Sequence, residues 1–279
     1  MSRDLVLAGL VLIVCGSLAW LSGLLPGRAA DATRERAAWR RLWAPLAPAA
    51  TMLAVLVGWA FQEPARTDEL LLPTALALAV PLGLVWMRAL ARAIFALRVR
   101  ADAPAAVVGL ARPRVEIDPT FARALDAAAL GAVLAHEEAH ARHRDPLRIW
   151  LAQIATDLQW PLGAAPARLA AWLEALELAR DDEARRAGVR GEDLASALVS
   201  AARFATGARR GVAATLGAPA SLLAVRVSRL LRPLEGDVAP ARARAWLAGA
   251  ALALAIAAGA LAGWTHGDLV LRALPFVTS

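Results

Sequence analysis

Four long apolar runs limit the folds open to this chain more than any other pattern in it. They cover residues 5–25, 46–61, 70–87 and 246–264. A helix of about 20 apolar residues is long enough to cross the ~30 Å hydrocarbon core of a bilayer. Hydrophobic residues make up 59% of the 279 residues, which is more than an ordinary soluble domain contains. The sequence therefore predicts a mainly α-helical fold with four transmembrane helices.

The basic residues are all arginine, and most of them lie beside these runs. This placement favours contact with a lipid bilayer and argues against direct binding of nucleic acid, although the net charge is +7. Basic residues mark the cytoplasmic side of a membrane, so the pattern puts both termini outside. We expect a multi-pass protein of the inner membrane. Its parts are three spans in residues 1–97, a cytoplasmic domain in 98–244, and a fourth span with a short external tail in 245–279.

The motif His-Glu-x-x-His occurs at residues 136–140, inside a long helical pattern. Residues four apart lie on one face of a helix, so His136 and His140 can aim imidazole nitrogens at one metal ion. Zinc held by two histidines and a carboxylate keeps a position open for water and lowers the pKa of that water toward ~7. Glu137 can accept the proton as the water attacks a peptide carbonyl. We interpret the nearby His143 as a solvated residue or an outer neighbour of the ligands.

The third ligand is expected on the helix predicted over residues 166–187. Glu177 and Asp181 are four residues apart and share one face of that helix. We predict that Glu177 binds zinc, and that Asp181 accepts a hydrogen bond from a ligating imidazole and so fixes its tautomer. A solvated acidic face is the alternative, because three further acidic residues lie on the same helix.

Shorter patterns predict the structure around the motif. Residues 105–108 and 114–117 are expected to form a β-hairpin, and an extended substrate would pair most naturally with the second strand. Asp118 and Asp126 are suited to cap the two helices that follow. The helix that carries the motif should end near Arg144, because the next helix begins at an Asp-Pro pair.

The stretch 109–150, followed by the Glu-Leu-Ala-Arg-Asp of residues 177–181, resembles the BlaR/MecR-type integral-membrane zinc metallopeptidases. The shared features are a Pro-Arg-Val strand, Leu-Ala before the metal motif, Arg-Asp-Pro-Leu after it, and the ExxxD of the later helix. Residues 221–231, which contain Arg226, resemble the stretch of the family that precedes the last span. The resemblance implies a gluzincin that binds one zinc ion, with three ligands and one general base: His136, His140 and Glu177, and Glu137.

The resemblance also implies that an extracellular sensor activates the zinc domain, which then cleaves a repressor or the receptor itself. Only 15 residues follow Trp264, too few for such a sensor. We therefore expect a membrane-embedded zinc endopeptidase without a C-terminal sensor domain. Its substrate would be a cytoplasmic or membrane-proximal protein, such as a transcriptional repressor, in regulatory signalling. Two alternatives stay open, namely a non-catalytic membrane signalling scaffold that keeps the zinc fold, and a quality-control protease for membrane proteins.

Overall fold

The computed structural model describes residues 35–47, 50, 71–98, 103–160, 163–208 and 220–234. These residues form eight helices and one two-stranded sheet, so the prediction of a mainly helical fold with a β-hairpin is confirmed. In chain order the elements are α2 (Glu35–Trp43), α4 (Leu71–Arg98), β1 (Ala105–Val108), β2 (Arg114–Ile117), α5 (Pro119–Ala124), α6 (Ala127–Arg142), α7 (Asp145–Leu158), α8 (Ala164–Arg186), α9 (Gly191–Ala208) and α10 (Ala220–Leu230). The strands are antiparallel, with Ala105 opposite Ile117.

The prediction of four transmembrane helices is wrong for the part of the chain that the structure describes. None of the helices there is both long and apolar enough to cross a membrane. The third predicted span ends before Arg88, but α4 continues through Arg88 and Arg92 to its last residue, Arg98. Arg88 and Arg92 bind Asp157 of α7 at 3.2 and 2.9 Å. These arginines therefore join α4 to α7.

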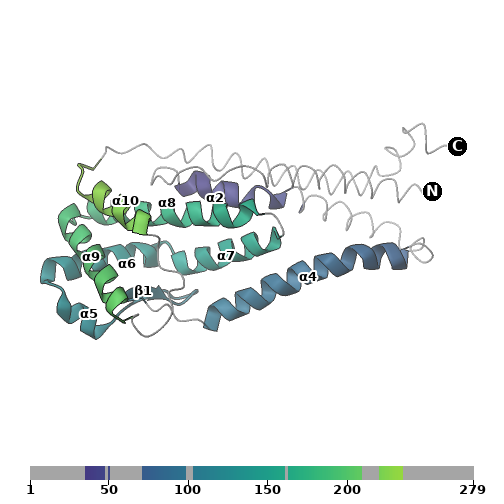
Figure 1. Ribbon diagram of the computed structural model, residues 1–279, viewed down its shortest axis with the longest axis horizontal. Helices are drawn as coiled ribbons and strands as arrows, with labels where there is room; N and C mark the ends of the chain where they lie inside the picture. The colour runs from purple at the N-terminus through teal and green to yellow at the C-terminus, as the bar shows by residue number, and fades with distance from the viewer. Residues whose placement is uncertain are drawn as a thin grey trace.

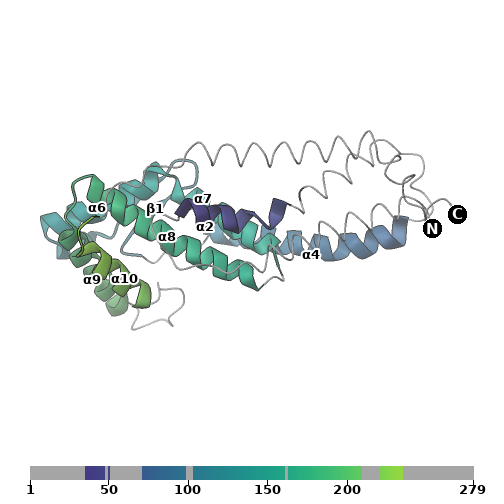
Figure 2. The same ribbon diagram turned by 90° about the horizontal axis from the view of Figure 1, so that it is seen from above.

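The structure does not test the other three predicted transmembrane spans. Residues 5–25 and 246–264 lie outside the described residues, as does nearly all of 46–61. Figures 1 and 2 show α4 running beside α7 and extending beyond it at the N-terminal end of α4. The predicted domain boundaries and the localisation stay predictions.

Short polar residues set the helix boundaries near the metal motif, as predicted. The Asp118 carboxylate accepts a hydrogen bond from the backbone N–H of Thr120 at 2.7 Å, and Asp126 accepts one from Ala129 at 2.7 Å. Helix α6 ends at Arg142, and α7 begins three residues later. Arg144, between them, has a left-handed backbone (φ 52°), which produces the sharp turn from α6 into α7.

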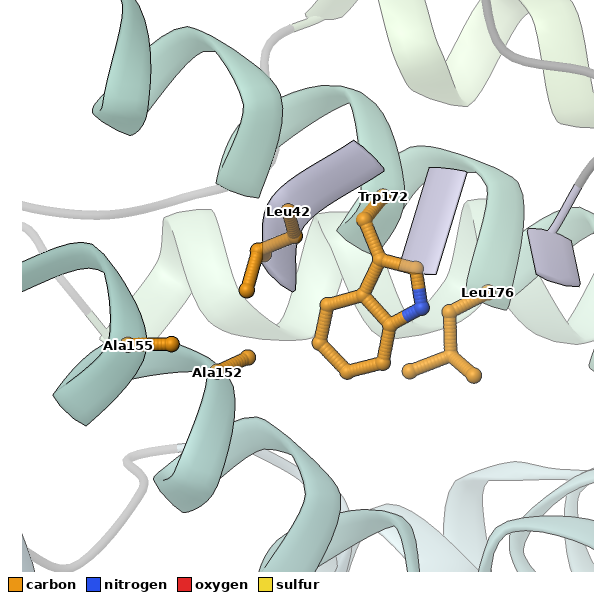
Figure 3. Packing of buried hydrophobic residues seen from close by; sticks show 5 residues of the cluster. All are labelled: Leu42, Ala152, Ala155, Trp172 and Leu176. Carbon is orange, nitrogen blue, oxygen red and sulfur yellow. The ribbon is translucent and has the colours of Figure 1, made fainter. Parts of the chain in front are cut away.

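Trp172 is the centre of one hydrophobic core, where α2, α7 and α8 meet. Its side chain is fully buried, and Figure 3 shows it beside Leu42 of α2 and two alanines of α7, Ala152 and Ala155. The alanines have small side chains, so α7 can approach the indole closely. The Trp172 Nε1–H donates to Glu35 at 3.1 Å, which ties α2 to α8. Helix α2 is not among the elements predicted from the sequence.

A second core joins α6, α8, α9 and α10 on the other side of the metal motif. It contains Ala132, Ala184, Leu194, Ala195 and Leu230. The start of α9 lies so close to the end of α10 that a Cβ atom at Gly191 would overlap the carbonyl oxygen of Leu230. This close approach fixes α10 against the rest of the domain, and α10 carries a side chain of the candidate site. Helix α9 is likewise not among the predicted elements.

Candidate metal centre

Helices α6 and α8 bring the three predicted ligands together. His136 and His140 lie one turn apart on α6, and their Nε2 atoms are 3.1 Å from each other. The Glu177 carboxylate of α8 faces both, with Oε2 at 3.5 Å from His136 Nε2 and Oε1 at 3.6 Å from His140 Nε2. One ligand atom from each residue lies within 4.8 Å of the others, so the group could hold a metal ion.

The outer nitrogen of each imidazole faces a carboxylate. His136 Nδ1 lies 3.0 Å from Asp181 Oδ1, and His140 Nδ1 lies 2.9 Å from Asp145 Oδ2. His140 Nδ1 forms a hydrogen bond with Asp145, so we assign the His140 proton to Nδ1 and its lone pair to Nε2. His136 Nδ1 is close to Asp181 but is not aligned for a hydrogen bond; Arg226 Nη2, which can only donate, lies 3.5 Å from His136 Nε2, so we assign the His136 lone pair to Nε2 as well. Two lone pairs this close repel each other unless a cation or a shared proton offsets them. The donor set therefore fits a metal ion.

Asp145 belongs to the site, although its position in the sequence indicates only the start of a helix. It follows His140 by five residues, and the left-handed turn at Arg144 brings its carboxylate to the imidazole. Asp145 is fully buried, and Arg180 binds it through Nε at 2.5 Å and Nη2 at 3.1 Å. Burial alone raises the pKa of Asp145, but His140 and Arg180 outweigh it and hold that pKa well below its usual range.

Asp145 also connects the site to α2. Arg148 donates to Asp145 Oδ1 at 2.9 Å and forms a second ion pair with Glu35. The outer side of His140 is thereby held by residues of α7, α8 and α2. A spacing rule within one helix does not reveal such a chain of contacts, because Glu35 and Arg148 are 113 residues apart.

Arg226 of α10 holds the outer side of His136. Its Nε and Nη2 each donate to the Asp181 carboxylate at 2.8 Å, and its Nη1 binds Glu177 Oε2 at 2.8 Å. Burial alone raises the pKa of Glu177, but Arg226 and the two histidines outweigh it and hold that pKa well below its usual range. Glu177 is therefore ionised at neutral pH, the state in which a carboxylate binds metal.

Glu137 lies next to the ligands and lines the same cavity. Burial raises the pKa of the Glu137 carboxyl, and the charges of His136 and His140 offset part of that effect. A carboxylate with a raised pKa is suited to accept a proton and return it. The role of Glu137 as general base stays a prediction, and its place in the cavity lining is compatible with that role.

The cavity has a volume of about 540 Å³ and two different walls. The polar wall holds the predicted ligands, Glu137 and Arg226, and the apolar wall comes mainly from β1, α7 and α9. Residues 105–107 of β1 line it, whereas the sequence favours β2 as the strand beside the substrate. A cavity of this size can hold several side chains of a peptide.

His143 points to a different partner. Its Nε2 lies 2.9 Å from Glu183, and its side chain is 47% exposed. The group of potential ligands does not include it. The interpretation of His143 as a solvated residue agrees with this position.

No protein-family model, no curated protein and no solved structure matches this chain. The resemblance to the BlaR/MecR-type metallopeptidases therefore stays a prediction.

Proposed function

We propose that this protein is a zinc-dependent endopeptidase that hydrolyses peptide bonds of a protein substrate. The observation that carries the proposal is the convergence of His136, His140 and Glu177 in a cavity that Glu137 also lines. Two imidazoles and one carboxylate are a ligand set of catalytic zinc sites, which leave one coordination position for water. A purely structural zinc site is closed by four protein ligands and needs no neighbouring general base.

The residues of the chain divide the chemistry between them. A bound zinc ion supplies a Lewis acid and lowers the pKa of water toward ~7. Glu137 accepts a proton from the attacking water as the oxygen–carbon bond forms at the scissile carbonyl. The same carboxyl then gives the proton to the peptide nitrogen as the carbon–nitrogen bond breaks, so no proton is left over. Asp181 and Asp145 keep His136 and His140 in the ligating tautomer.

The shape of the cavity supports a peptide as the substrate. Strand β1 borders the cavity, and its described pairing is with β2 on one edge. An extended peptide that pairs with the other edge of β1 would run past the polar wall, with alternate side chains directed to the apolar wall. A transcriptional repressor, the substrate that the resemblance implies, is one protein that could supply such a segment.

The proposal is tested with a library of quenched-fluorescent peptides and the purified, zinc-loaded protein. We expect the wild type to cleave a subset of the peptides. The Glu137→Gln variant should retain zinc and fold but lose about 10²–10⁴-fold in rate, because it lacks the base. Glu138→Gln, at the neighbouring position, is the matched control and should keep the wild-type rate.

Two outcomes would contradict the proposal. A zinc-loaded wild type that cleaves no peptide and no unfolded protein would favour the scaffold alternative. Cleavage at an undiminished rate by Glu137→Gln would show that Glu137 is not the base.

A further inference from the structure

We propose that Arg226 stabilises the oxyanion that forms on the scissile carbonyl, in addition to holding Glu177 in place. This inference rests on the proposed endopeptidase function. From the sequence, Arg226 is known only as a member of the stretch 221–231, which resembles the BlaR/MecR-type family. The inference gives this residue a catalytic role. The role would make α10, 90 residues after His136, a part of the catalytic site.

Peptide hydrolysis requires a donor for the carbonyl oxygen. Negative charge develops on that oxygen as water attacks, and a fixed donor there commonly contributes about 10²–10³-fold in rate. The chain contains no tyrosine, and two of its four histidines are the predicted ligands. A third, His143, is exposed and bound to Glu183. Among the described residues that line the cavity, Arg226 is the only arginine.

The guanidinium of Arg226 has one donor left for a substrate. It carries five N–H groups. Three of them are used by Asp181 and Glu177, and a fourth, on Nη2, is directed to His136 Nε2, which leaves one N–H on Nη1. Nη2 lies 3.5 Å from His136 Nε2, and Nη1 lies 2.8 Å from Glu177 Oε2. The remaining N–H is thus on Nη1, beside Glu177, one of the three predicted zinc ligands.

The guanidinium is also held rigidly, as transition-state stabilisation requires. Arg226 is only 9% exposed, and Asp181 binds its Nε and Nη2 as a two-point pair. The close approach of Gly191 to Leu230 fixes the helix that carries it. Glutamine at position 226 would lose the charge and the fork, whereas lysine would keep the charge as a single point.

The test compares Arg226→Gln and Arg226→Lys with the wild type, all saturated with zinc and checked for zinc content. The matched control is Arg229→Gln, because Arg229 joins α10 to α8 through Asp182 but lies outside the cavity lining. The substrate is the best-cleaved peptide of the library. The second probe is the phosphonate analogue of that peptide, a stable mimic of the tetrahedral oxyanion, and its binding is measured by calorimetry.

We expect Arg226→Gln to lower kcat by about 10²–10³-fold while KM changes by less than about threefold. Phosphonate affinity should fall by the same factor as kcat/KM, and Arg226→Lys should lie between Arg226→Gln and the wild type. Arg229→Gln should stay within about threefold of the wild type. If Arg226→Gln does not fold, Arg226→Lys is decisive and should lose at least about tenfold in phosphonate affinity.

The inference is overturned if a folded, zinc-loaded Arg226 variant keeps its kcat and its phosphonate affinity. A higher KM with an unchanged kcat also overturns it. That result would mean that Arg226 binds the substrate and the transition state equally well. Failure of the wild type to cleave any peptide is a different result. It contradicts the proposed function itself, before any Arg226 variant is compared.

Discussion

The two sides of the candidate metal centre repeat one arrangement. On one side His136 faces Asp181, which Arg226 binds through Nε and Nη2. On the other side His140 faces Asp145, which Arg180 binds through the same two nitrogens. In each case the remaining nitrogen, Nη1, binds a glutamate.

The two glutamates make the sides differ. Arg226 binds Glu177, a predicted ligand, and lines the cavity. Arg180 binds Glu183, and Glu183 also contacts the exposed side chains of Arg142 and His143 at the end of α6. The same pairing of aspartate and arginine can thus serve a structural purpose on one side and face the substrate on the other. Substitutions on each side test this distinction.

The largest effect on folding is expected from the structural side. Arg180→Met leaves the buried Asp145 with one arginine instead of two, because only Arg148 remains. Loss of one partner of a buried ion pair costs about 3–5 kcal/mol, so the free energy of unfolding should fall by that order. Urea unfolding of the metal-free protein measures it. Arg114→Met, which breaks the exposed ion pair with Glu116, is the control and should cost about 1 kcal/mol or less.

If Arg180→Met lowers the free energy of unfolding by less than about 1 kcal/mol, the structural role of the His140 side is contradicted. Equal losses for Arg180→Met and Arg114→Met would also contradict that role, because they would show that burial of the ion pair does not matter.

Substitution of Asp145 or Asp181 distinguishes the two sides of the site by ligand binding, where the arginine substitutions do so by stability. Asp145→Asn and Asp181→Asn should each lower zinc affinity by about 10–100-fold, because each removes the carboxylate that orients a ligating imidazole. Asp181→Asn should also weaken binding of the phosphonate peptide at saturating zinc, since it releases Arg226. Competition with a chromophoric chelator measures the first effect and calorimetry the second. Weakened phosphonate binding in Asp145→Asn alone would reverse the assignment of the two sides.

A smaller effect is expected from pH. Burial lowers the pKa of His136, but Asp181 and Glu177 outweigh it and raise that pKa to about 9 in the metal-free site. Zinc binds the neutral imidazole, so a proton must leave below pH 9 before zinc can bind. Zinc affinity should therefore fall by roughly tenfold for each pH unit below about 9. Titrations at three pH values, corrected for the chelator, measure the slope.

The raised pKa of His136 also makes the stability of the metal-free protein depend on pH. Because the folded pKa of His136 lies above its ordinary value of 6.5, its proton stabilises the metal-free protein fully below pH 6.5. That contribution is lost as the pH rises through about 9. Asp181→Asn should reduce both pH effects. A slope that is unchanged in this variant would show that Asp181 is not what raises the pKa of His136.

Local patterns predicted much of the framework around the site. The hairpin strands have the predicted bounds, and Asp118 and Asp126 cap the helices as expected. The caps depend on residues two or three positions apart, and the hairpin pairs residues within 105–117, so the signals of both are complete in a short stretch of sequence. The same holds for His136 and His140, because helical spacing alone puts them on one face.

The rest depends on contacts between distant segments. Arg226 reaches Asp181 across 45 residues, and Arg180 reaches Asp145 across 35, and no short pattern reports either contact. Asp145 had a weak signal, its position directly after the motif helix. The membrane prediction at α4 came from the apolar run 70–87, and the arginines after it were interpreted as its cytoplasmic boundary. No helix among the described residues is long and apolar enough to span a membrane. In the structure Arg88 and Arg92 bind a buried aspartate.

The central claim is that His136, His140 and Glu177 form one zinc site. Elemental analysis of the purified protein tests it most directly, with wild type beside His140→Ala and Glu177→Ala. His143→Ala is the matched control, since His143 lies in the same motif region but binds Glu183. We expect about one zinc per chain in the wild type and His143→Ala, and a loss of zinc in the other two variants while they stay folded. Absence of zinc from a wild type purified with zinc present, or full zinc in both ligand variants, would contradict the claim.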